Sequence, residues 1–533
     1  MRFNTAGPVS SKHDYCIPPL SRVSLDKILA QIGRMRYFVM HGPSQTGKTS
    51  TLLALQDYLN KGGEHRCLYV NFECGHAAGE DTGRAMRALL ASLASRACSI
   101  LQDDFVEERL SAHLEKYGPD AALRETLGRW AQSSRLPLVL MVDEIDTLVG
   151  DTLVSVLRQL AAGYGSRPDR FPQTVILCGV QDVREYQILS DGDGASFTGG
   201  SALDMETESL RLADFSVAEV HQLLAQHTAE CGQAFEEGVA ERIWSLTLGQ
   251  PWLVSALAHK ACARAGKESR GRNSPIDLDS IDQAREELIL GRGTHFRQFT
   301  DRLDEMQVRR VILPMLAGSE NRAYSSRDLE YVRSLGLVSV DREVRMANPM
   351  YAEAIPRELT LVLESILAGW VEPDRYVNSD GSLGVARLLN SFQGWFRENA
   401  ELCVERFGHK EAGPQLSLQA YLQLVVTSRG HIERDYAVGR GRTDLLIKWR
   451  QVDQRGRAQI RQYLIECRSR TAAGDFDRLV RKGREQASAY MDRCGAESGH
   501  LVIFDLLADM SWDDRLYGTA PVPGESPITV WDV

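Results

Sequence analysis

The fold of this 533-residue chain is decided by the stretch His41-Gly42-Pro43-Ser44-Gln45-Thr46-Gly47-Lys48-Thr49-Ser50. It follows an apolar run at 37–40 and leads into a helical pattern at 51–59. A glycine-bracketed loop between a strand and a helix is the context in which the pattern G-x-x-x-x-G-K-S/T binds phosphate. The sequence therefore predicts a P-loop whose backbone N–H groups, together with the helix start, cradle the phosphates of ATP.

Individual residues of this loop have distinct predicted roles. Gly42 and Gly47 allow sharp turns and a close approach of the backbone to phosphate. Lys48 is expected to neutralise the β- and γ-phosphates in the catalytic centre, and Thr49 to hold Mg²⁺ through its hydroxyl. The residues predicted to bind the nucleotide are Gly42, Pro43, Ser44, Gln45, Thr46, Gly47, Lys48, Thr49 and Ser50.

A second acidic site is expected at the end of another buried strand. Residues 138–142 form a continuous apolar run, as parallel strands do, and Asp143 and Glu144 follow it. Asp143 is expected to bind Mg²⁺, and Glu144 to polarise the attacking water. Asp146 is interpreted as a helix-start residue rather than a ligand. These two motifs predict an α/β P-loop ATPase core over residues 1–205.

Two further parts of this core are candidates for contacts with ATP. Residues 15–20 either line the adenine pocket or form a plain surface arm. A buried strand at 174–178 precedes polar residues at the position where P-loop switches sense the γ-phosphate. Among these residues Arg184 is the best candidate for stabilising charge during catalysis. The candidates are Gln181, Asp182 and Arg184.

The composition bounds the class of protein. The length suggests three or four domains, and 43% hydrophobic with 25% charged residues is an ordinary globular balance. A net charge of −10 argues against a uniformly basic surface for nucleic acid, although local basic patches remain compatible with it. The ten cysteines form no C-x-x-C pair, and no apolar stretch approaches the ~18 residues of a membrane span. We expect reduced thiols and a cytoplasmic location.

Residues 206–297 are expected to form a helical lid. Amphipathic helices reach about residue 265, and they include Gly249-Gln250-Pro251, where a proline opens a helix. The order of P-loop, acidic strand, lid and Gly-x-Pro resembles the archaeal-type and STAND-related AAA+ ATPases. In that group the proline contacts the nucleotide, so the resemblance implies that Pro251 is a nucleotide sensor. It also implies a possible homo-oligomer in which a neighbouring copy supplies an arginine.

Residues 298–365 have the pattern of a winged helix. Helical segments at 308–316 and 325–335 are followed by two short strand-like segments, which predict a hairpin. Acidic residues balance the arginines of the second helix, so this helix is not notably basic. Two interpretations therefore stay open, DNA contact and a regulatory packing module.

The last domain, residues 383–533, carries a second chemical pattern. The segments Gly441-Arg442-Thr443-Asp444 and Glu466-Cys467-Arg468 lie on two predicted strands of one hairpin. Asp444 and Glu466 would then face each other and could share a divalent ion that activates water for phosphodiester hydrolysis. On spacing alone, a hairpin with two solvated acids is an equally good interpretation.

These segments resemble the PD-(D/E)XK nuclease superfamily, with Glu411 opening the first helix and Gln486 and Tyr490 on one face of a later helix. The whole chain resembles a family of bacterial proteins that fuse an archaeal-type AAA ATPase to such a domain. The resemblance implies an α/β nuclease-like domain that binds Mg²⁺ or Mn²⁺. The implied metal ligands are Glu411, Asp444 and Glu466, and the implied catalytic residues are Asp444, Glu466 and Arg468.

Arg468 departs from the family pattern, because it stands where the family has its catalytic lysine. Arginine keeps the charge but changes its reach and geometry, which implies either weak activity or a degenerate site that only grips nucleic acid. Residues 429–493 hold 16 Lys/Arg against 9 Asp/Glu, a balance that favours the phosphates of DNA or RNA. We expect an ATP-regulated DNA-processing protein, and the alternative is a STAND-like signalling switch with a catalytically silent C-terminal domain.

Overall fold

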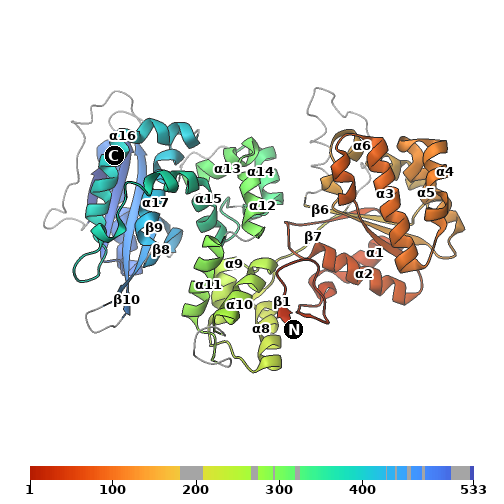
Figure 1. Cartoon of the computed structure of the whole chain (residues 1–533), viewed down its shortest axis with the longest axis horizontal. Helices are drawn as coiled ribbons and strands as arrows, with labels where there is room; N and C mark the ends of the chain where they lie inside the picture. Colours follow the sequence, from red (N-terminus) through yellow and green to blue (C-terminus); the bar gives the residue numbers. More distant parts are fainter. Residues whose placement is uncertain are drawn as a thin grey trace. The chain divides into compact units, whose positions relative to one another are not determined.

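The computed structural model divides into two compact units, which we describe separately (Figure 1). The first comprises Met1–Ala284 with Arg333–Leu337, and the second comprises Arg285–Val332 with Val338–Val533. The predicted sensors Gln181, Asp182 and Arg184 lie outside the described residues. Among the helices that are described, none is both long and apolar enough to cross a membrane. The structure describes residues 1–180, 208–265, 274–291, 294–317, 324–341, 343–407, 409–427, 429–438, 441–452, 458–470, 475–505 and 528–533.

A parallel β-sheet forms the centre of the first unit. Its strands are β3 (Phe38–His41), β4 (Arg66–Asn71), β5 (Leu138–Asp143), β6 (Thr174–Gly179) and β7 (Glu208–Arg211). They lie in the order β4-β5-β6-β3-β7, and every neighbouring pair is parallel. β3, β5 and β6 coincide with the apolar runs of the sequence, so the expected α/β P-loop fold with a parallel sheet is confirmed.

Side chains of these strands alternate between two apolar cores, one on each face of the sheet. On β3, Phe38 and Met40 belong to the core that also contains residues of α1 and α2, whereas Val39 belongs to the other core. The helices on the two faces are α1 (Leu25–Gly33) and α2 (Lys48–Gly62) on one, and α3 (Thr82–Arg96), α4 (Phe105–Tyr117), α5 (Pro119–Ser133) and α6 (Gly150–Ala162) on the other (Figure 1). This arrangement brings the carboxyl ends of β3 and β5, with the P-loop and the acidic pair, to one edge of the sheet.

Helix α4 is not among the elements predicted from the sequence. Only Val106 and His113 of α4 are buried, and its first turn carries Glu107 and Glu108. Phe105, Leu110 and Leu114 are only partly buried against the core, so the apolar pattern of α4 is weak.

An N-terminal arm packs on the helical lid within the first unit. The arm contains the paired strands β1 (Arg2–Phe3) and β2 (Asp14–Tyr15) and the 3₁₀ helix η1 (Pro19–Arg22). The region predicted to form the lid, for which we keep that name, contains α8 (Val217–Cys231), α9 (Val239–Thr247), α10 (Pro251–Ala265) and α11 (Leu278–Leu290). The rings of Phe3 and Tyr15 lie 5.3 and 5.4 Å from the ring of His227 on α8, so aromatic contacts fix the arm to the lid.

The region predicted as a winged helix contains α12 (Thr294–Leu303), α13 (Met306–Leu316), α14 (Ser326–Ser334) and α15 (Pro349–Leu367). Helices α13 and α14 match the two predicted helices. The predicted hairpin is reduced to one antiparallel bridge between Val338 and Met346, beside a hydrogen bond from Ser339 N–H to the carbonyl of Arg345 at 2.8 Å. The winged-helix assignment stays a prediction.

A second, mixed sheet forms the C-terminal part of the second unit. Its strands are β8 (Gly430–Val438), β9 (Gly441–Val452), β10 (Ala458–Arg470), β11 (Ser498–Asp505) and β12 (Ile528–Asp532). They lie in the order β12-β11-β10-β9-β8. The pairs β8/β9 and β9/β10 are antiparallel, and β10/β11 and β11/β12 are parallel. The predicted hairpin that carries the two acids is therefore present as β9 and β10.

Helices cover both faces of this second sheet. Residues of α18 (Phe476–Cys494) pack with Leu464 and Ile503 in one apolar core. Phe504, next to Ile503 and so on the other face, contacts the rings of Phe392 and Phe396 on α16 (Val385–Phe407). Tyr421 on α17 (Ala412–Val426) joins the same aromatic cluster. The assignment of this α/β domain as nuclease-like stays a prediction.

Candidate functional site

The P-loop connects β3 to α2, and its carbonyl groups accept hydrogen bonds from Lys48. Gly47 has a left-handed backbone with φ of +95°, and a Cβ atom there would lie 2.7 Å from the Arg22 guanidinium, so this position requires glycine. The Lys48 Nζ donates to the carbonyl of Gly42 at 2.8 Å and to that of Pro43 at 3.0 Å. The ammonium group thus lies on the loop that the sequence predicts to bind phosphate.

Thr49 and Asp143 meet as the paired motifs require. The Thr49 hydroxyl donates to Asp143 Oδ2 at 2.7 Å, and the Tyr69 hydroxyl donates to the same oxygen at 3.1 Å. The Asp143 side chain is fully buried at the end of β5. A hydroxyl and a carboxylate side by side are the oxygen donors that Mg²⁺ prefers, so the two residues fit the predicted cation and would hold it. Bound there, the cation would offset the charge of the phosphates.

Glu144 combines an unusual backbone with an unusual pKa. Its φ of +54° lies in the left-handed region, which costs a non-glycine residue of order 1 kcal/mol. Burial raises the pKa of its carboxyl group to about 7, although the nearby Lys48 ammonium lowers it. A carboxyl group with such a pKa can accept a proton near neutral pH, which is what the predicted role toward water requires.

Asp146 has a structural partner instead of a catalytic one. It lies in the short 3₁₀ helix Ile145–Thr147, and its Oδ2 accepts the N–H of Val180 at 2.8 Å. This bond ties the end of β5 to the end of β6, in agreement with the structural interpretation of Asp146.

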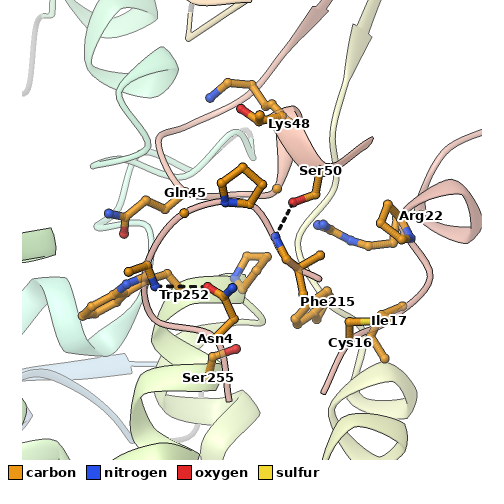
Figure 2. A pocket seen from close by; sticks show the side chains of 18 of the residues that line it. Asn4, Cys16, Ile17, Arg22, Gln45, Lys48, Ser50, Phe215, Trp252 and Ser255 are labelled. Carbon is orange, nitrogen blue, oxygen red and sulfur yellow. Dashed lines mark hydrogen bonds between the residues drawn. The ribbon is translucent and has the colours of Figure 1, made fainter. Parts of the chain in front are cut away.

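A cavity of about 270 Å³ adjoins the P-loop within the first unit (Figure 2). It is bounded by the arm, the P-loop, Glu144 and the lid. The structure therefore places residues 15–17 and Pro19 of the predicted arm at the cavity, as well as Pro251. Its walls comprise Asn4, Ala6, Gly7, Pro8, Val9, Tyr15, Cys16, Ile17, Pro19, Arg22, Ser44, Gln45, Gly47, Lys48, Thr49, Ser50, Glu144, Phe215, Leu223, Pro251, Trp252 and Ser255.

Hydrogen bonds hold the arm against the P-loop and the lid. The N–H of Val9 donates to Ser50 Oγ at 3.0 Å, and the Trp252 indole N–H donates to the carbonyl of Thr5 at 2.8 Å. The Gln226 side chain on α8 bonds both the N–H and the carbonyl of Cys16 at 3.0 Å. A change in the lid can therefore reach the cavity wall through the arm.

Arg22 is a cavity residue that sequence reasoning misses. Its Nη1 donates to the carbonyl of Thr46 at 2.7 Å, its Nη2 donates to that of Ala213 at 2.6 Å, and its guanidinium lies 4.6 Å from the centre of the Phe215 ring. Arg22 thus joins the P-loop to the segment that precedes the lid. No motif contains it, and its only signal is its place as the arginine that ends the Pro-containing arm.

The residues of the predicted second site also converge. Cys467 N–H donates to Asp444 Oδ2 at 2.7 Å across β9 and β10. The Arg468 guanidinium lies 3.4 Å from Asp444 Oδ2, 2.5 Å from Glu466 Oε1 and 2.6 Å from Gln486 Oε1. Gln486 Nε2 in turn donates to the Tyr490 hydroxyl at 2.9 Å. One arginine therefore ties together residues of two strands and one helix.

The charge balance of this cluster differs from that of a metal centre. Glu466 is 1% exposed, and burial together with the Asp444 carboxylate raises its pKa, while Arg468 lowers it. Within the residues that the structure describes, no group of three or more His, Cys, Asp or Glu is arranged to hold a metal ion. Glu411 occupies the N-cap position of α17 without a side-chain capping hydrogen bond, and within the described residues it is not gathered with Asp444 and Glu466 into such a group. Arg468 pairs with both acids, so the two carboxylates are satisfied in this structure without a cation.

The basic stretch 429–493 contributes fewer surface charges than its composition suggests. Arg434 is buried and donates to Gln419 Oε1 at 2.7 Å, and Lys448 pairs with Glu433 at 2.9 Å. Arg470 pairs with Asp505 at 3.1 Å. The exposed basic side chains of this stretch include Arg429, Arg450, Arg478, Arg481, Lys482 and Arg493.

Comparison with known proteins finds a family match over the part of the chain that contains the P-loop and the acidic pair. Residues 34–187 match a family described as an AAA domain. A Walker-type ATPase of Pyrococcus abyssi is 16% identical with a TM-score of 0.44, covering 66% of this chain and 98% of its own. Cdc6p from Pyrobaculum aerophilum is 14% identical with a TM-score of 0.34, covering 65% and 92%. The RuvB Holliday junction branch migration motor of Thermotoga maritima is 14% identical with a TM-score of 0.33, covering 61% and 92%. No curated protein matches the chain.

Proposed function

Since residues 34–187 are an AAA-type P-loop ATPase domain and the protein is an ATPase, we propose that ATP binding and hydrolysis control a C-terminal domain that binds or cleaves DNA. The observation that carries the proposal is the convergence of Asp444, Glu466, Arg468 and Gln486 at one point of the second sheet. Four polar residues from separated stretches meet there, one of them an acid that is 1% exposed. Buried titratable groups held together in this way are typical of functional sites.

In the ATPase domain, the residues of this chain act by position and charge. The loop amides and Lys48 bind the phosphates, and Thr49 with Asp143 hold Mg²⁺. Glu144 orients the attacking water and takes up its proton, for which its raised pKa suits it. Pro251 and Arg22 position the nucleotide from the lid and from the arm, since both line the same cavity.

Helix α11 is the proposed route from the ATPase domain to the C-terminal sheet. Its residue Arg285 is 3% exposed and pairs with Glu353 on α15 at 3.7 Å and with Glu433 on β8 at 3.5 Å. The next residue, Glu286, pairs with Arg357 on α15 at 2.8 Å. Breaking a buried ion pair costs several kcal/mol, so these residues move together with α15 and β8. A lid movement that displaces α11 is thereby passed to the C-terminal domain.

Each proposed domain has its own function. Residues 1–205 hydrolyse ATP, 206–297 form the lid, 298–365 act as a winged-helix connector, and 383–533 engage DNA rather than RNA. Exposed arginines and lysines near α18 supply attraction to phosphates that does not depend on sequence. A homo-oligomer, in which one copy completes the ATPase site of another, belongs to the proposal as well.

One observation favours a second candidate, a STAND-like signalling ATPase whose C-terminal domain is catalytically silent. Arg468 pairs with both acids. Its Nη2 lies 2.5 Å from Glu466 Oε1, and its Nη1 lies 3.4 Å from Asp444 Oδ2. A guanidinium in that place satisfies the two carboxylates without a cation. The domain would then serve as an interaction module.

Cleavage assays separate the two candidates. Purified protein is incubated with plasmid and linear DNA in Mg²⁺ or Mn²⁺, with and without ATP, beside Lys48→Ala and Asp444→Ala. Asp492→Ala, which changes an exposed acid of α18, is the matched control. If Asp444→Ala abolishes cutting and Asp492→Ala retains it, the result supports a nuclease. Loss of cutting in Lys48→Ala would support control by ATP. Intact DNA alongside normal ATP hydrolysis favours the signalling switch.

A further inference from the structure

Two cysteines of the lid converge on one histidine behind the nucleotide cavity. The Sγ of Cys231, the last residue of α8, lies 3.2 Å from His227 Nε2. The Sγ of Cys262 on α10 lies 3.6 Å from the same nitrogen. The two sulfurs are therefore at most about 7 Å apart, although 30 residues separate them in the sequence. We propose that Cys231 and Cys262 form a redox-responsive dithiol that becomes a disulfide and regulates the nucleotide site.

The surroundings divide the two thiols into an entry point and a partner. Cys231 is exposed and can meet an oxidant, whereas Cys262 is half-buried. Burial, and then the nearby Cys231, raises the pKa of Cys262 to about 12, so Cys262 stays a thiol until its partner has reacted. The Tyr15 hydroxyl lies 3.2 Å from His227 Nδ1, and Gln233 Oε1 lies 3.0 Å from Nε2. Because an amide oxygen only accepts, the ring hydrogen lies on Nε2, the nitrogen that both sulfurs approach.

The oxidant class that fits an exposed thiol of this kind is a hydroperoxide. The Cys231 sulfur attacks one peroxide oxygen, the O–O bond breaks, and Cys231 becomes a sulfenic acid, while the other oxygen leaves as water, or as an alcohol, with the thiol proton. The Cys262 sulfur then attacks the Cys231 sulfur, an S–S bond forms, and the sulfenic oxygen leaves as water with the Cys262 proton. With hydrogen peroxide, two thiols and one peroxide give one disulfide and two waters. The helix end can adjust, because α8 stops at Cys231 and Gly232 follows with φ of +76°.

The bond would act on the cavity through the arm. The same turn of α8 holds the arm, since His227 contacts Tyr15 and the neighbouring Gln226 bonds both backbone groups of Cys16. Tyr15 and Cys16 both line the cavity. A disulfide that draws the end of α8 toward α10 displaces His227 and loosens this wall. This consequence rests on the proposed nucleotide site, whereas formation of the disulfide does not.

The test uses the full chain and two independent measurements. Wild type, Cys231→Ser, Cys262→Ser and the control Cys74→Ser, which changes another exposed thiol, are treated with hydrogen peroxide. Peptide mapping without reductant then reports the linkage, and a fluorescent ATP analogue with Mg²⁺ reports affinity before oxidation, after it, and after dithiothreitol.

After peroxide, we expect a linked 231–262 peptide in wild type and in Cys74→Ser. Their affinity for the ATP analogue should be about fivefold weaker, as the loss of about one hydrogen bond implies, and dithiothreitol should restore it. Cys231→Ser and Cys262→Ser should keep their affinity in peroxide. The dithiol is refuted if wild type yields no 231–262 linkage, and its regulatory role is refuted if the linkage forms without a change in affinity. Reduced protein that binds no nucleotide would contradict the proposed function, while the peptide map would still decide the dithiol.

Discussion

Glu144 offers the sharpest quantitative prediction, because burial raises its pKa to about 7 from an ordinary 4.5. A general base must be deprotonated to act. With a pKa of about 7, roughly nine-tenths of the Glu144 carboxyl groups are deprotonated at pH 8 and roughly one-tenth at pH 6. The kcat/KM for ATP should therefore fall about tenfold from pH 8 to pH 6. A carboxyl group with the ordinary pKa would change it by only a few per cent.

The assay is steady-state release of phosphate at several ATP concentrations between pH 5.5 and 8.5, at constant ionic strength. A terminal phosphate itself titrates at about pH 6, so Mg²⁺ is kept in excess and nucleotide affinity is measured separately at each pH. The variant Glu144→Gln serves that purpose, since it should bind ATP and barely hydrolyse it.

The rate of hydrolysis should change with pH in one direction. Hydrolysis is retained above the raised pKa and lost as the pH falls through it, because protonation removes the base. A profile that is flat between pH 6 and 8 after correction for binding would refute the assignment of Glu144 as the base. So would a Glu144→Gln variant that hydrolyses ATP like the wild type.

Three further predictions concern partly buried charges. Arg22→Ala should weaken nucleotide binding about tenfold and lower the melting temperature, since two charge-assisted hydrogen bonds of about 1.5 kcal/mol or more each are lost. Arg22→Lys should restore little of the affinity or the melting temperature. Equilibrium binding and calorimetry measure the two effects. Arg468→Ala should lower the free energy of unfolding by about 3 kcal/mol at pH 8. The loss should be smaller at pH 6, because Glu466, whose pKa is already raised, then becomes neutral. A loss that does not depend on pH in urea titrations would contradict this. Burial raises the pKa of Glu433, but His431, Lys448 and Arg285 hold it well below its ordinary value of 4.5. The stabilisation is therefore fully present above pH 4.5 and declines as the pH falls from there toward the lowered pKa, so Glu433→Gln should lower the melting temperature at pH 7 and by less at pH 3.

The ATPase half was largely predictable from sequence, because its signals are local. The loop at 41–50 and the acid pair at 143–144 each combine a buried strand with fixed spacing, and the Thr49–Asp143 hydrogen bond of 2.7 Å confirms that the two motifs meet. Helix α4 was not predictable, since only Val106 and His113 are buried and its other large apolar side chains are only partly buried against the core. Arg22 was not predictable either, because its partners Thr46 and Ala213 are far away in the sequence.

The C-terminal half was predictable in outline. The predicted hairpin is present as β9 and β10, and on it Asp444 lies beside Cys467 and Arg468. What spacing does not reveal is which charge satisfies the acids, and the short distance from Arg468 to Glu466 decides that point. The basic composition of 429–493 also overstates the surface charge, since residues such as Arg434 are buried with partners of their own.

The central claim is that the nucleotide state governs how the C-terminal domain engages DNA, and one binding measurement tests it most directly. The anisotropy of a labelled DNA duplex is titrated with Glu144→Gln in Mg²⁺ with ATP, with ADP and without nucleotide, and with Lys48→Ala in ATP. The account predicts an affinity for DNA that differs at least severalfold between the ATP and ADP states of Glu144→Gln, and a Lys48→Ala variant that behaves as if no nucleotide were present. Equal affinity in every state, or no binding in any of them, would contradict it.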